Sequence, residues 1–288
     1  MDRFLIITNR EKDTGLNLTN QIADYIKKAG KTAILSSVST MQALADEVIG
    51  EGSFDCAIVL GGDGTIIQTA YDLMTHDIPI LGVNLGTLGF LAEIEQQNVF
   101  EALERLFKDD YQIEERIMIE GEIVRNNKNQ KDNINFFSAL NDAVITRKGF
   151  SRIISLHIYV NDILVDMFKG DGVIISTPTG STAYNLSAGG PIVTQGAAVM
   201  VITPICPHSL SPRSVVVSAE DTIRIVIGRS KKTQEAEASV SFDGKSEIDL
   251  GTDDAVIIKK SKHSTRLVKL NHSGIYEVLR SKLESCGD

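Results

Sequence analysis

Residues 56–65 have the sequence CAIVLGGDGT, and this stretch decides the fold of the first third of the chain. The apolar run Cys56–Leu60 is typical of a strand that is buried on both faces. The glycines that follow it end the strand, and Thr65–Met74 has the composition of a helix. Apolar strands that alternate with helices form parallel sheets covered on both sides, so the stretch predicts an α/β domain.

The segments on either side repeat this alternation of short apolar runs with helical spacing of apolar residues. Gly30 stands where a helix would need a C-terminal cap. The expected strands are Phe4–Thr8, Thr32–Leu35 and Ile80–Val83, and the expected helices are Leu18–Ala29, Thr40–Ile49 and Ala102–Phe107.

The pattern changes near residue 110, where apolar residues begin to alternate with polar ones along Ile117–Ile123. This period of two is typical of strands, and Asn161-Asp162 suits a hairpin turn. We therefore expect an α/β domain at 1–108, an all-β, sandwich-like domain at 109–269, and a tail at 270–288 with a helix at Tyr276–Leu283. The further strands expected are Phe136–Thr146, Ile153–Val160, Ile163–Phe168, Val173–Ser176, Val215–Ser218, Ile223–Ile227, Ser239–Phe242 and Val256–Lys259.

The composition excludes several classes of protein. The 288 residues include 29 Lys and Arg against 38 Asp and Glu, a net charge of −9, which disfavours a nucleic-acid-binding protein. The three widely spaced cysteines fit neither a disulfide framework nor a cysteine-rich zinc site. No segment approaches the roughly 20 apolar residues that span a bilayer. We therefore expect a cytoplasmic protein without a membrane partner.

The glycine loop after Leu60 suits the binding of phosphates. Glycines let the backbone approach an anion closely, and the first amides of the following helix are free to bind it. Asp63 in this loop can take a proton from a hydroxyl or help to hold Mg²⁺. The alternative is an ordinary strand–helix turn, since the loop lacks the P-loop and dinucleotide-binding spacings. The residues expected at the ATP phosphates are Gly61, Gly62, Gly64 and Thr65.

Three later segments place polar or aromatic groups beside predicted strands. Gly82–Leu91 is a second glycine-rich loop and contains Phe90, which suits either base stacking or a core position. Asn141 and Asp142 interrupt an apolar strand pattern, so they are either ligand contacts or a strand end. Lys169–Tyr184 leads through a short strand into a loop rich in hydroxyl groups, with a helix expected to begin near Ser181. This loop suits a polar ligand.

Together these motifs make the chain resemble the NAD kinase family. The match is specific because four motifs occur in order, the last of them long and rich in hydroxyl groups. They are GGDGT at 61–65, the loop at 82–91, Leu-Asn-Asp at 140–142 and the segment at 170–184, with Phe242-Asp243-Gly244 as a later element.

The resemblance implies transfer of a phosphoryl group from ATP to the 2′-hydroxyl of the adenosine ribose of NAD, giving NADP. It implies a phosphofructokinase-like first domain, a tail that returns to it, and a site between the domains. It also implies a homodimer or homotetramer with the NAD site near a subunit interface. Mg²⁺ or another divalent cation would arrive with ATP, with no metal site of the protein itself.

The same resemblance implies roles for single residues. Asp63 would be the general base of the transfer. The others implied at NAD are Gly64 beside the dinucleotide, Phe90, Thr182 and Ala183 at the adenine, Asn141 and Asp142 at the hydroxyls and the nicotinamide end, Asp171 on the nicotinamide side, and Tyr184 against the ligand.

Two other functions remain open at this point. A lipid or sugar kinase can share the GGDG loop, although a lipid kinase favours an apolar patch or a basic membrane-facing surface. A catalytically silent sensor of NAD or NADP is the second, and the presence of Asp63 argues against it. Three basic residues that follow the Asn141-Asp142 pair suit either phosphate contacts or a solvated charged loop; they are Arg147, Lys148 and Arg152.

Overall fold

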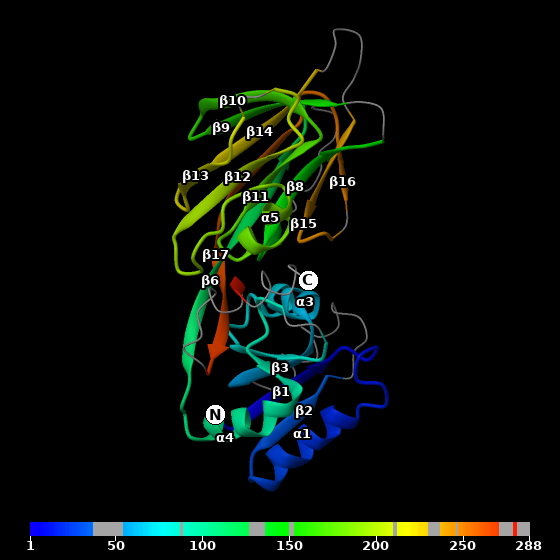
Figure 1. Cartoon of the computed structure of the whole chain (residues 1–288), viewed down its shortest axis with the longest axis vertical. Coiled ribbons are helices and arrows are strands. Elements are labelled where there is room, and N and C mark those ends of the chain that lie inside the picture. Colours follow the sequence, from blue (N-terminus) through cyan, green and yellow to red (C-terminus); the bar gives the residue numbers. More distant parts are fainter. Residues whose placement is uncertain are drawn as a thin grey trace. The chain divides into compact units, whose positions relative to one another are not determined.

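The chain is described by a computed structural model over residues 1–36, 54–86, 89–126, 136–149, 153–209, 212–229, 237–245, 247–270 and 279–280. Its contacts form two units, one from residues 1–116 with 264–288 and one from residues 117–263 (Figure 1). Unit 2 is therefore inserted into unit 1. The predicted helix Thr40–Ile49 lies outside the described residues, as does most of the predicted tail helix, of which only 279–280 are described.

Unit 1 is built on a parallel sheet, which confirms that prediction. The strand order is β2-β1-β3-β4. Strand β4 also pairs with β5 and, through Ile80, with Leu267 near the end of β17. All of these pairings are parallel. The strands are β1 Arg3–Thr8, β2 Thr32–Leu35, β3 Cys56–Gly61, β4 Ile80–Asn84 and β5 Ile94–Glu95.

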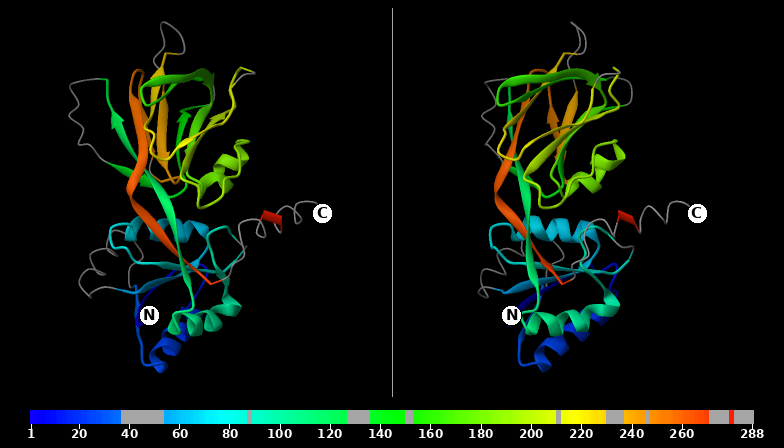
Figure 2. Two further views of the ribbon diagram at one scale, coloured as in Figure 1. Left: turned by 90° about the vertical axis from the view of Figure 1, so that its left-hand side faces the viewer. Right: turned by 60° about the vertical axis from the view of Figure 1, so that its left-hand side comes forward.

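Helices cover both faces of this sheet (Figures 1 and 2). Helices α1 (Asn17–Lys28) and α4 (Val99–Phe107), the latter preceded by a 3-10 turn at Gln96–Asn98, pack side by side against one face. Helix α3 (Asp63–Leu73) packs against the other face, where a Cβ on Gly82 would collide with Ile66. The sequence predicted a helix start at Thr65, but α3 begins at Asp63, so the aspartate belongs to its first turn.

Unit 2 consists of two sheets around a shared apolar core, as predicted for a sandwich-like domain. One sheet has the order β10-β9-β14-β17 and includes β6 and β7, and the other has the order β13-β12-β11-β8-β15-β16. The chain passes between the units within β6 and β17. The bounds are β6 Gln112–Val124, β7 Phe137–Ala139, β8 Asp142–Arg147, β9 Ile154–Val160, β10 Ile163–Gly170, β11 Gly172–Ser176, β12 Val199–Ile205, β13 Val215–Ser218, β14 Ile223–Gly228, β15 Ala238–Phe242, β16 Ile248–Leu250 and β17 Ala255–Lys269, with a 3-10 turn η2 at Gly180–Thr182 and a short helix α5 at Tyr184–Ser187.

The structure corrects one predicted strand and confirms one turn. The single strand expected at Phe136–Thr146 is wrong, because the chain breaks at Leu140 and Asn141 into β7 and β8. The predicted hairpin turn is confirmed, since Asn161 and Asp162 both have positive φ, at 49° and 64°. None of the helices in the described ranges has the length and apolar character required to cross a bilayer.

Candidate active site

The two glycine loops of unit 1 lie at the carboxyl ends of neighbouring strands. β3 and β4 are paired in parallel up to Gly61 and Asn84, so the loops that follow them leave the same edge of the sheet. The amide of Leu85 donates to the Gly61 carbonyl at 2.9 Å and ties the two loops together. This is the edge of an open α/β sheet at which ligands bind.

Asp63 connects the first loop to the second. Its two carboxylate oxygens accept hydrogen bonds from the backbone amides of Phe90, at 2.8 Å, and Leu91, at 3.2 Å. A Cβ on Gly89 would overlap this carboxylate, so glycine is required there for the close approach. Each carboxylate oxygen has two acceptor positions, and these bonds leave one on each oxygen for another donor.

The glycines predicted at the ATP phosphates have different surroundings. Gly61 is buried, and a Cβ on it would collide with the Thr65 side chain, so its small size serves packing. Gly64 is exposed, and a Cβ there would meet no described atom within 4 Å. Gly62 is the N-terminal cap of α3 and makes no side-chain capping bond. Gly64 therefore leaves space for a ligand, whereas Gly61 fixes the turn.

Lys12 is a residue at this site that the sequence analysis missed. Its Nζ lies 3.0 Å from the position that a Cβ would take on Gly62 and 3.3 Å from that on Gly86. Within the described ranges no carboxylate pairs with Lys12, which is exposed. The side chain therefore places a positive charge over both glycine loops, a position that its location 50 residues before Gly62 does not reveal.

The loop that carries Lys12 is anchored at both ends. The Asn9 amide donates to the Leu60 carbonyl at 2.9 Å, and the Asn9 carbonyl accepts from Lys12 at 3.1 Å. Asp13 accepts hydrogen bonds from the Thr19 amide, at 2.9 Å, and from its hydroxyl, at 2.6 Å. These contacts fix the backbone of Lys12 relative to β3 and α1.

In unit 2, the segment Leu140–Asp142 has all of its backbone groups paired. The amides of its three residues donate to the Asp243 carboxylate at 2.7, 2.7 and 3.2 Å. The Leu140 carbonyl accepts from the Thr177 hydroxyl at 2.6 Å, and the Asn141 carbonyl accepts from the Thr177 amide at 2.9 Å. The Asp142 carbonyl accepts from the Asp243 amide at 2.9 Å. This pairing explains the break between β7 and β8.

The side chains of Asn141 and Asp142 take no part in this pairing. The Asn141 Oδ1 atom is buried and has no hydrogen-bond partner among the described residues. Asp142 is 5% exposed, and burial raises the pKa of its carboxyl group to about 7, with the charge of Asp243 adding to the rise. Buried polar groups are normally paired, so these two side chains are available to a ligand.

The hydroxyl groups of the predicted ligand loop bond largely to the loop itself. Ser181 donates to the Pro178 carbonyl at 2.6 Å, and Thr182 donates to the Thr179 carbonyl at 3.3 Å. Ser176 donates to the Thr177 carbonyl at 2.9 Å. All three side chains are buried. These hydroxyl groups therefore hold together a loop that has little regular structure. This structural cause of the hydroxyl-rich composition was not found from the sequence.

The remaining predicted residues of unit 2 lie around this loop. Asp171 precedes β11, and its carboxylate accepts from Arg147 Nε at 2.6 Å, so Arg147 forms an ion pair in the described structure. Ala183 connects η2 to α5, and Tyr184, the first residue of α5, is 44% exposed. The expected helix start at Ser181 thus corresponds to the 3-10 turn η2.

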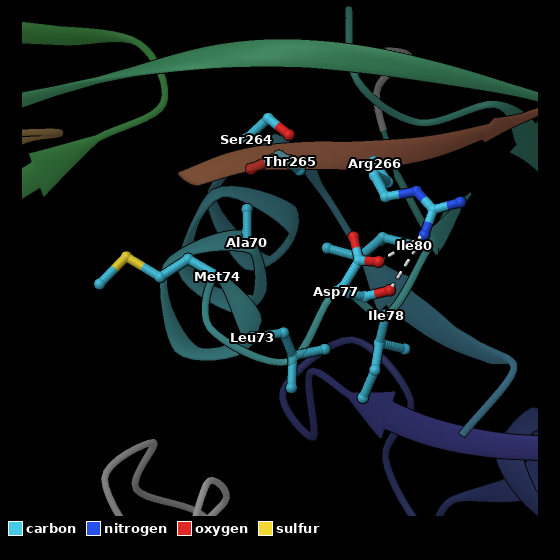
Figure 3. Close-up of a pocket in the computed structure, with 9 residues that line it drawn as sticks. All are labelled: Ala70, Leu73, Met74, Asp77, Ile78, Ile80, Ser264, Thr265 and Arg266. Atoms are coloured by element: carbon cyan, nitrogen blue, oxygen red, sulfur yellow. Dashed lines mark hydrogen bonds and ion pairs between the residues drawn. The ribbon is translucent and has the colours of Figure 1, made fainter. Parts of the chain in front are cut away.

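A small pocket in unit 1 lies away from these residues (Figure 3). It is lined by the C-terminal end of α3, by the start of β4 and by Ser264–Arg266, and Arg266 donates to the Asp77 carboxylate at 2.9 Å beside it. Helix α3 has 11 residues, so at 1.5 Å per residue its far end is about 15 Å from Asp63. The pocket is therefore separate from the glycine loops. The described residues contain no group of three or more His, Cys, Asp or Glu residues arranged to hold a metal ion.

Comparison with known proteins identifies the family. The ATP-NAD kinase N-terminal domain matches residues 4–111, and the ATP-NAD kinase C-terminal domain matches residues 140–270. The chain belongs to the ATP-NAD kinase family. It is therefore a phosphotransferase with an alcohol group as acceptor, and the lipid-kinase and sugar-kinase alternatives are set aside.

Two similar members of the ATP-NAD kinase family match over nearly their whole length. The NAD kinase of Lachnoclostridium phytofermentans is 50% identical over 283 residues, which cover 98% of this chain and 99% of that protein. The NAD kinase of Caldanaerobacter subterraneus subsp. tengcongensis is 41% identical over 290 residues, with coverage of 98% and 99%.

Solved structures of the same family have the same fold. A yeast NADH kinase complexed with NADH has a TM-score of 0.83 at 23% identity, over 97% of this chain and 87% of that one. An NAD kinase from Archaeoglobus fulgidus in complex with ATP has a TM-score of 0.76 at 24% identity, over 98% and 99%.

Proposed function

We propose that this chain makes NADP by transferring the terminal phosphoryl group of ATP to the 2′-hydroxyl of the adenosine ribose of NAD, with Asp63 as the general base. The single observation that carries the proposal is the fixed carboxylate of Asp63 at a glycine loop, in a chain that matches both domains of the ATP-NAD kinase family.

The surroundings of Asp63 support its role as a base. The amides of Phe90 and Leu91 orient the carboxylate, and one acceptor position on each oxygen remains for the proton of the ribose hydroxyl. A base held in place by backbone groups loses little freedom when the substrate binds. The transfer forms the bond from the 2′-oxygen to the phosphorus and breaks the bond to the leaving ADP, while the hydroxyl proton passes to Asp63.

The groups around the first glycine loop support phosphate binding. The first amides of α3 have no partner within the helix, and Gly64 leaves the approach to them open. Lys12 adds a positive charge above Gly62 and Gly86. We therefore assign Gly61, Gly62, Gly64, Thr65 and Lys12 to the ATP phosphates, with Gly61 and Thr65 shaping the loop.

The NAD contacts that we assign fall in both units. In unit 1 they are Gly64 beside Asp63 and Phe90 at the adenine. In unit 2 the buried Oδ1 atom of the half-buried Asn141 and the buried carboxyl group of Asp142 have no partner among the described residues, so these side chains suit the hydroxyls and the carboxamide of a dinucleotide. The further contacts assigned in unit 2 are Asp171, Thr182, Ala183 and Tyr184.

The family resemblance supports several further assignments. Mg²⁺ or another divalent cation enters as part of the ATP substrate and neutralises its phosphate charge. The first domain is phosphofructokinase-like. The enzyme works in the cytoplasm as a homodimer or homotetramer with the NAD site near a subunit interface. The edge strand β10 exposes Ile163, Leu164, Val165 and Met167, which supports self-association.

The test is an endpoint assay with purified protein, Mg-ATP and NAD. A dehydrogenase that accepts only NADP reads the product, and a parallel sample with EDTA tests the need for the cation. We expect NADP to accumulate only with ATP, NAD and Mg²⁺ all present. If no NADP forms while NAD still binds in calorimetry, the proposal fails and a silent dinucleotide sensor takes its place.

A further inference from the structure

The segment Leu140–Asp142 lacks the support that a regular strand would give it. It consists of the two residues between β7 and β8 and the first residue of β8, so its backbone groups are not paired as they would be in a continuous strand. An unpaired buried amide or carbonyl is costly, and a strand end of this kind normally relies on water or side chains. Here one distant carboxylate takes all three amides.

That carboxylate belongs to Asp243, which directly follows β15 and is 101 to 103 residues away from the segment. Asp243 has φ of +50°, in the left-handed region. Its own amide donates to the Asp142 carbonyl at 2.9 Å, so side chain and backbone hold the segment together. Thr177, which directly follows β11, completes the pairing by donating to the carbonyls of Leu140 and Asn141.

The chemistry of the contact requires a carboxylate. An ionised carboxyl group only accepts hydrogen bonds, and its two oxygens offer enough positions for three amide donors. An amide in the same place would offer one accepting oxygen and turn an NH₂ group towards the other backbone N–H. The substitution Asp243→Asn therefore leaves at least one amide of the segment without an acceptor.

We propose that Asp243 is a positioning residue for dinucleotide binding, and that it acts by fixing the backbone from which the Asn141 and Asp142 side chains project. The inference rests on the proposed NAD contacts of these two residues. Because the backbone is fully paired by Asp243 and Thr177, the two side chains are held ready before the ligand arrives, which lowers the entropic cost of binding.

The experiment compares four variants in the NADP assay at neutral pH, with KM measured separately for NAD and for ATP. For Asp243→Asn and for Asn141→Ala we expect KM for NAD to rise on the order of tenfold or more, because small displacements of binding groups have large effects. KM for ATP should stay within about twofold of the wild-type value, since Asp243 holds no part of the glycine loops.

The control is Asp254→Asn. Asp254 is also a buried carboxylate of unit 2 that accepts backbone amides, from Asn126 and Gly251 at 2.9 Å each, but it contacts none of the proposed NAD residues. We expect it to lower the melting temperature without raising KM for NAD. An equal rise in KM for NAD in both aspartate variants would overturn the inference, because the effect would then follow from general loss of stability.

Thr177→Val is a second way to weaken the backbone pairing of Leu140–Asp142, and it is used if Asp243→Asn does not fold. It removes the hydroxyl that donates to the Leu140 carbonyl and keeps the shape of the side chain. We expect a smaller rise in KM for NAD at unchanged KM for ATP, and faster hydrogen exchange of the amides of 140–142. If Asp243→Asn and Thr177→Val both have a normal KM for NAD while Asn141→Ala has a raised one, the role of Asp243 is overturned and the proposed NAD contacts stand. Normal KM for NAD in Asn141→Ala would instead overturn the proposed NAD contacts and the role of Asp243 with them.

Discussion

The two candidate binding regions hold an aspartate in different ways. In unit 1, Asp63 is oriented through its own carboxylate oxygens, which accept two amides from a loop 27 and 28 residues along the chain. In unit 2, the Asp142 carboxylate accepts no hydrogen bond from the described residues, and its position is set through its backbone by Asp243. The first arrangement suits a group that must accept a proton at a defined point. The second suits a ligand contact, because the backbone is fixed while the carboxyl group remains unpaired among the described residues.

The largest effect is expected for Asp63→Asn, which removes the group assigned as the base. The amide cannot take a proton from the ribose hydroxyl, so we expect kcat to fall by about 10²–10⁴-fold. The variant also leaves the amide of Phe90 or of Leu91 without an acceptor, so we expect a lower melting temperature as well, and kcat is measured below it on folded protein. Glu101→Gln is the control, because Glu101 is an acidic residue in the first turn of another helix of unit 1 and is away from the glycine loops. Turnover of folded Asp63→Asn near the wild-type rate would show that Asp63 is not the base.

The pH dependence of stability tests the state of Asp142. Its folded pKa, about 7, lies above the ordinary value of 3.8, so protonated Asp142 stabilises the fold at low pH and this stability is lost as pH rises through 7. Asp142→Asn has no such proton to lose. From urea unfolding at pH 5 and pH 8, we expect wild type to lose about 2–3 kcal/mol of unfolding free energy relative to this variant.

Asp254, in the same unit, has a lowered pKa where that of Asp142 is raised, so Asp254→Asn should respond to pH in a different way. Burial alone would raise the pKa of Asp254, but hydrogen bonds from Gly251, Asn126 and Arg125 together lower it. The ionised Asp254 carboxylate therefore stabilises the fold above pH 4, and this stability is lost on acidification. The unfolding free energy of Asp254→Asn should differ from that of wild type by a constant amount between pH 5 and 8. If the unfolding free energies of wild type and Asp142→Asn change in parallel between pH 5 and 8, the raised pKa of Asp142 is contradicted.

Lys12→Met tests the phosphate-binding part of unit 1. The variant removes the charge above Gly62 and Gly86 and keeps much of the apolar stem, so we expect KM for ATP to rise about tenfold, as for the loss of one charged hydrogen bond. KM for NAD should change much less. Lys27→Met, in the exposed last turn of α1, is the matched control. Equal KM for ATP in the two lysine variants would remove Lys12 from the site.

The smallest expected effect is that of Gly64→Ala. A Cβ at this position meets no described atom within 4 Å and Gly64 does not have positive φ, so the fold should tolerate it. If the ATP phosphates approach the backbone here, the methyl group should raise KM for ATP several-fold, up to about tenfold. Gly196→Ala, which is equally open and lies in unit 2, should leave KM for ATP unchanged. A normal KM for ATP in Gly64→Ala would show that no phosphate approaches this glycine.

Much of unit 1 could be predicted because its signals are local. The run Cys56–Leu60 becomes β3, Thr32–Leu35 becomes β2 without change, and Gly30 caps α1 with φ of +76°. The start of α3 at Asp63 was missed because glycines do not resemble a helix start, although Gly62 serves as the cap. In such a domain, propensity and patterning act in the same direction as the tertiary contacts.

Unit 2 could be predicted only in part because its decisive contacts are not local. The break at Leu140 and Asn141 depends on Asp243, about 100 residues later, and no property of the segment itself reveals it. β12 was missed because Pro204 is uncommon within a strand, and here it pairs with Val173. Lys12 was missed for the same kind of reason, since its place over the glycine loops comes from the fold of the Asn9–Thr19 segment.

The insertion of unit 2 into unit 1 has a consequence for synthesis on the ribosome. Unit 1 needs residues from both ends of the chain, because Leu267 pairs with Ile80 and the Leu270 amide donates to Glu93 at 2.8 Å. A nascent chain that has emerged as far as residue 263 therefore holds a whole unit 2 but an unfinished unit 1. The unit that starts second is the first whose residues are all available, and the β-strands of unit 1 gain their last partner only after all of unit 2 has been made.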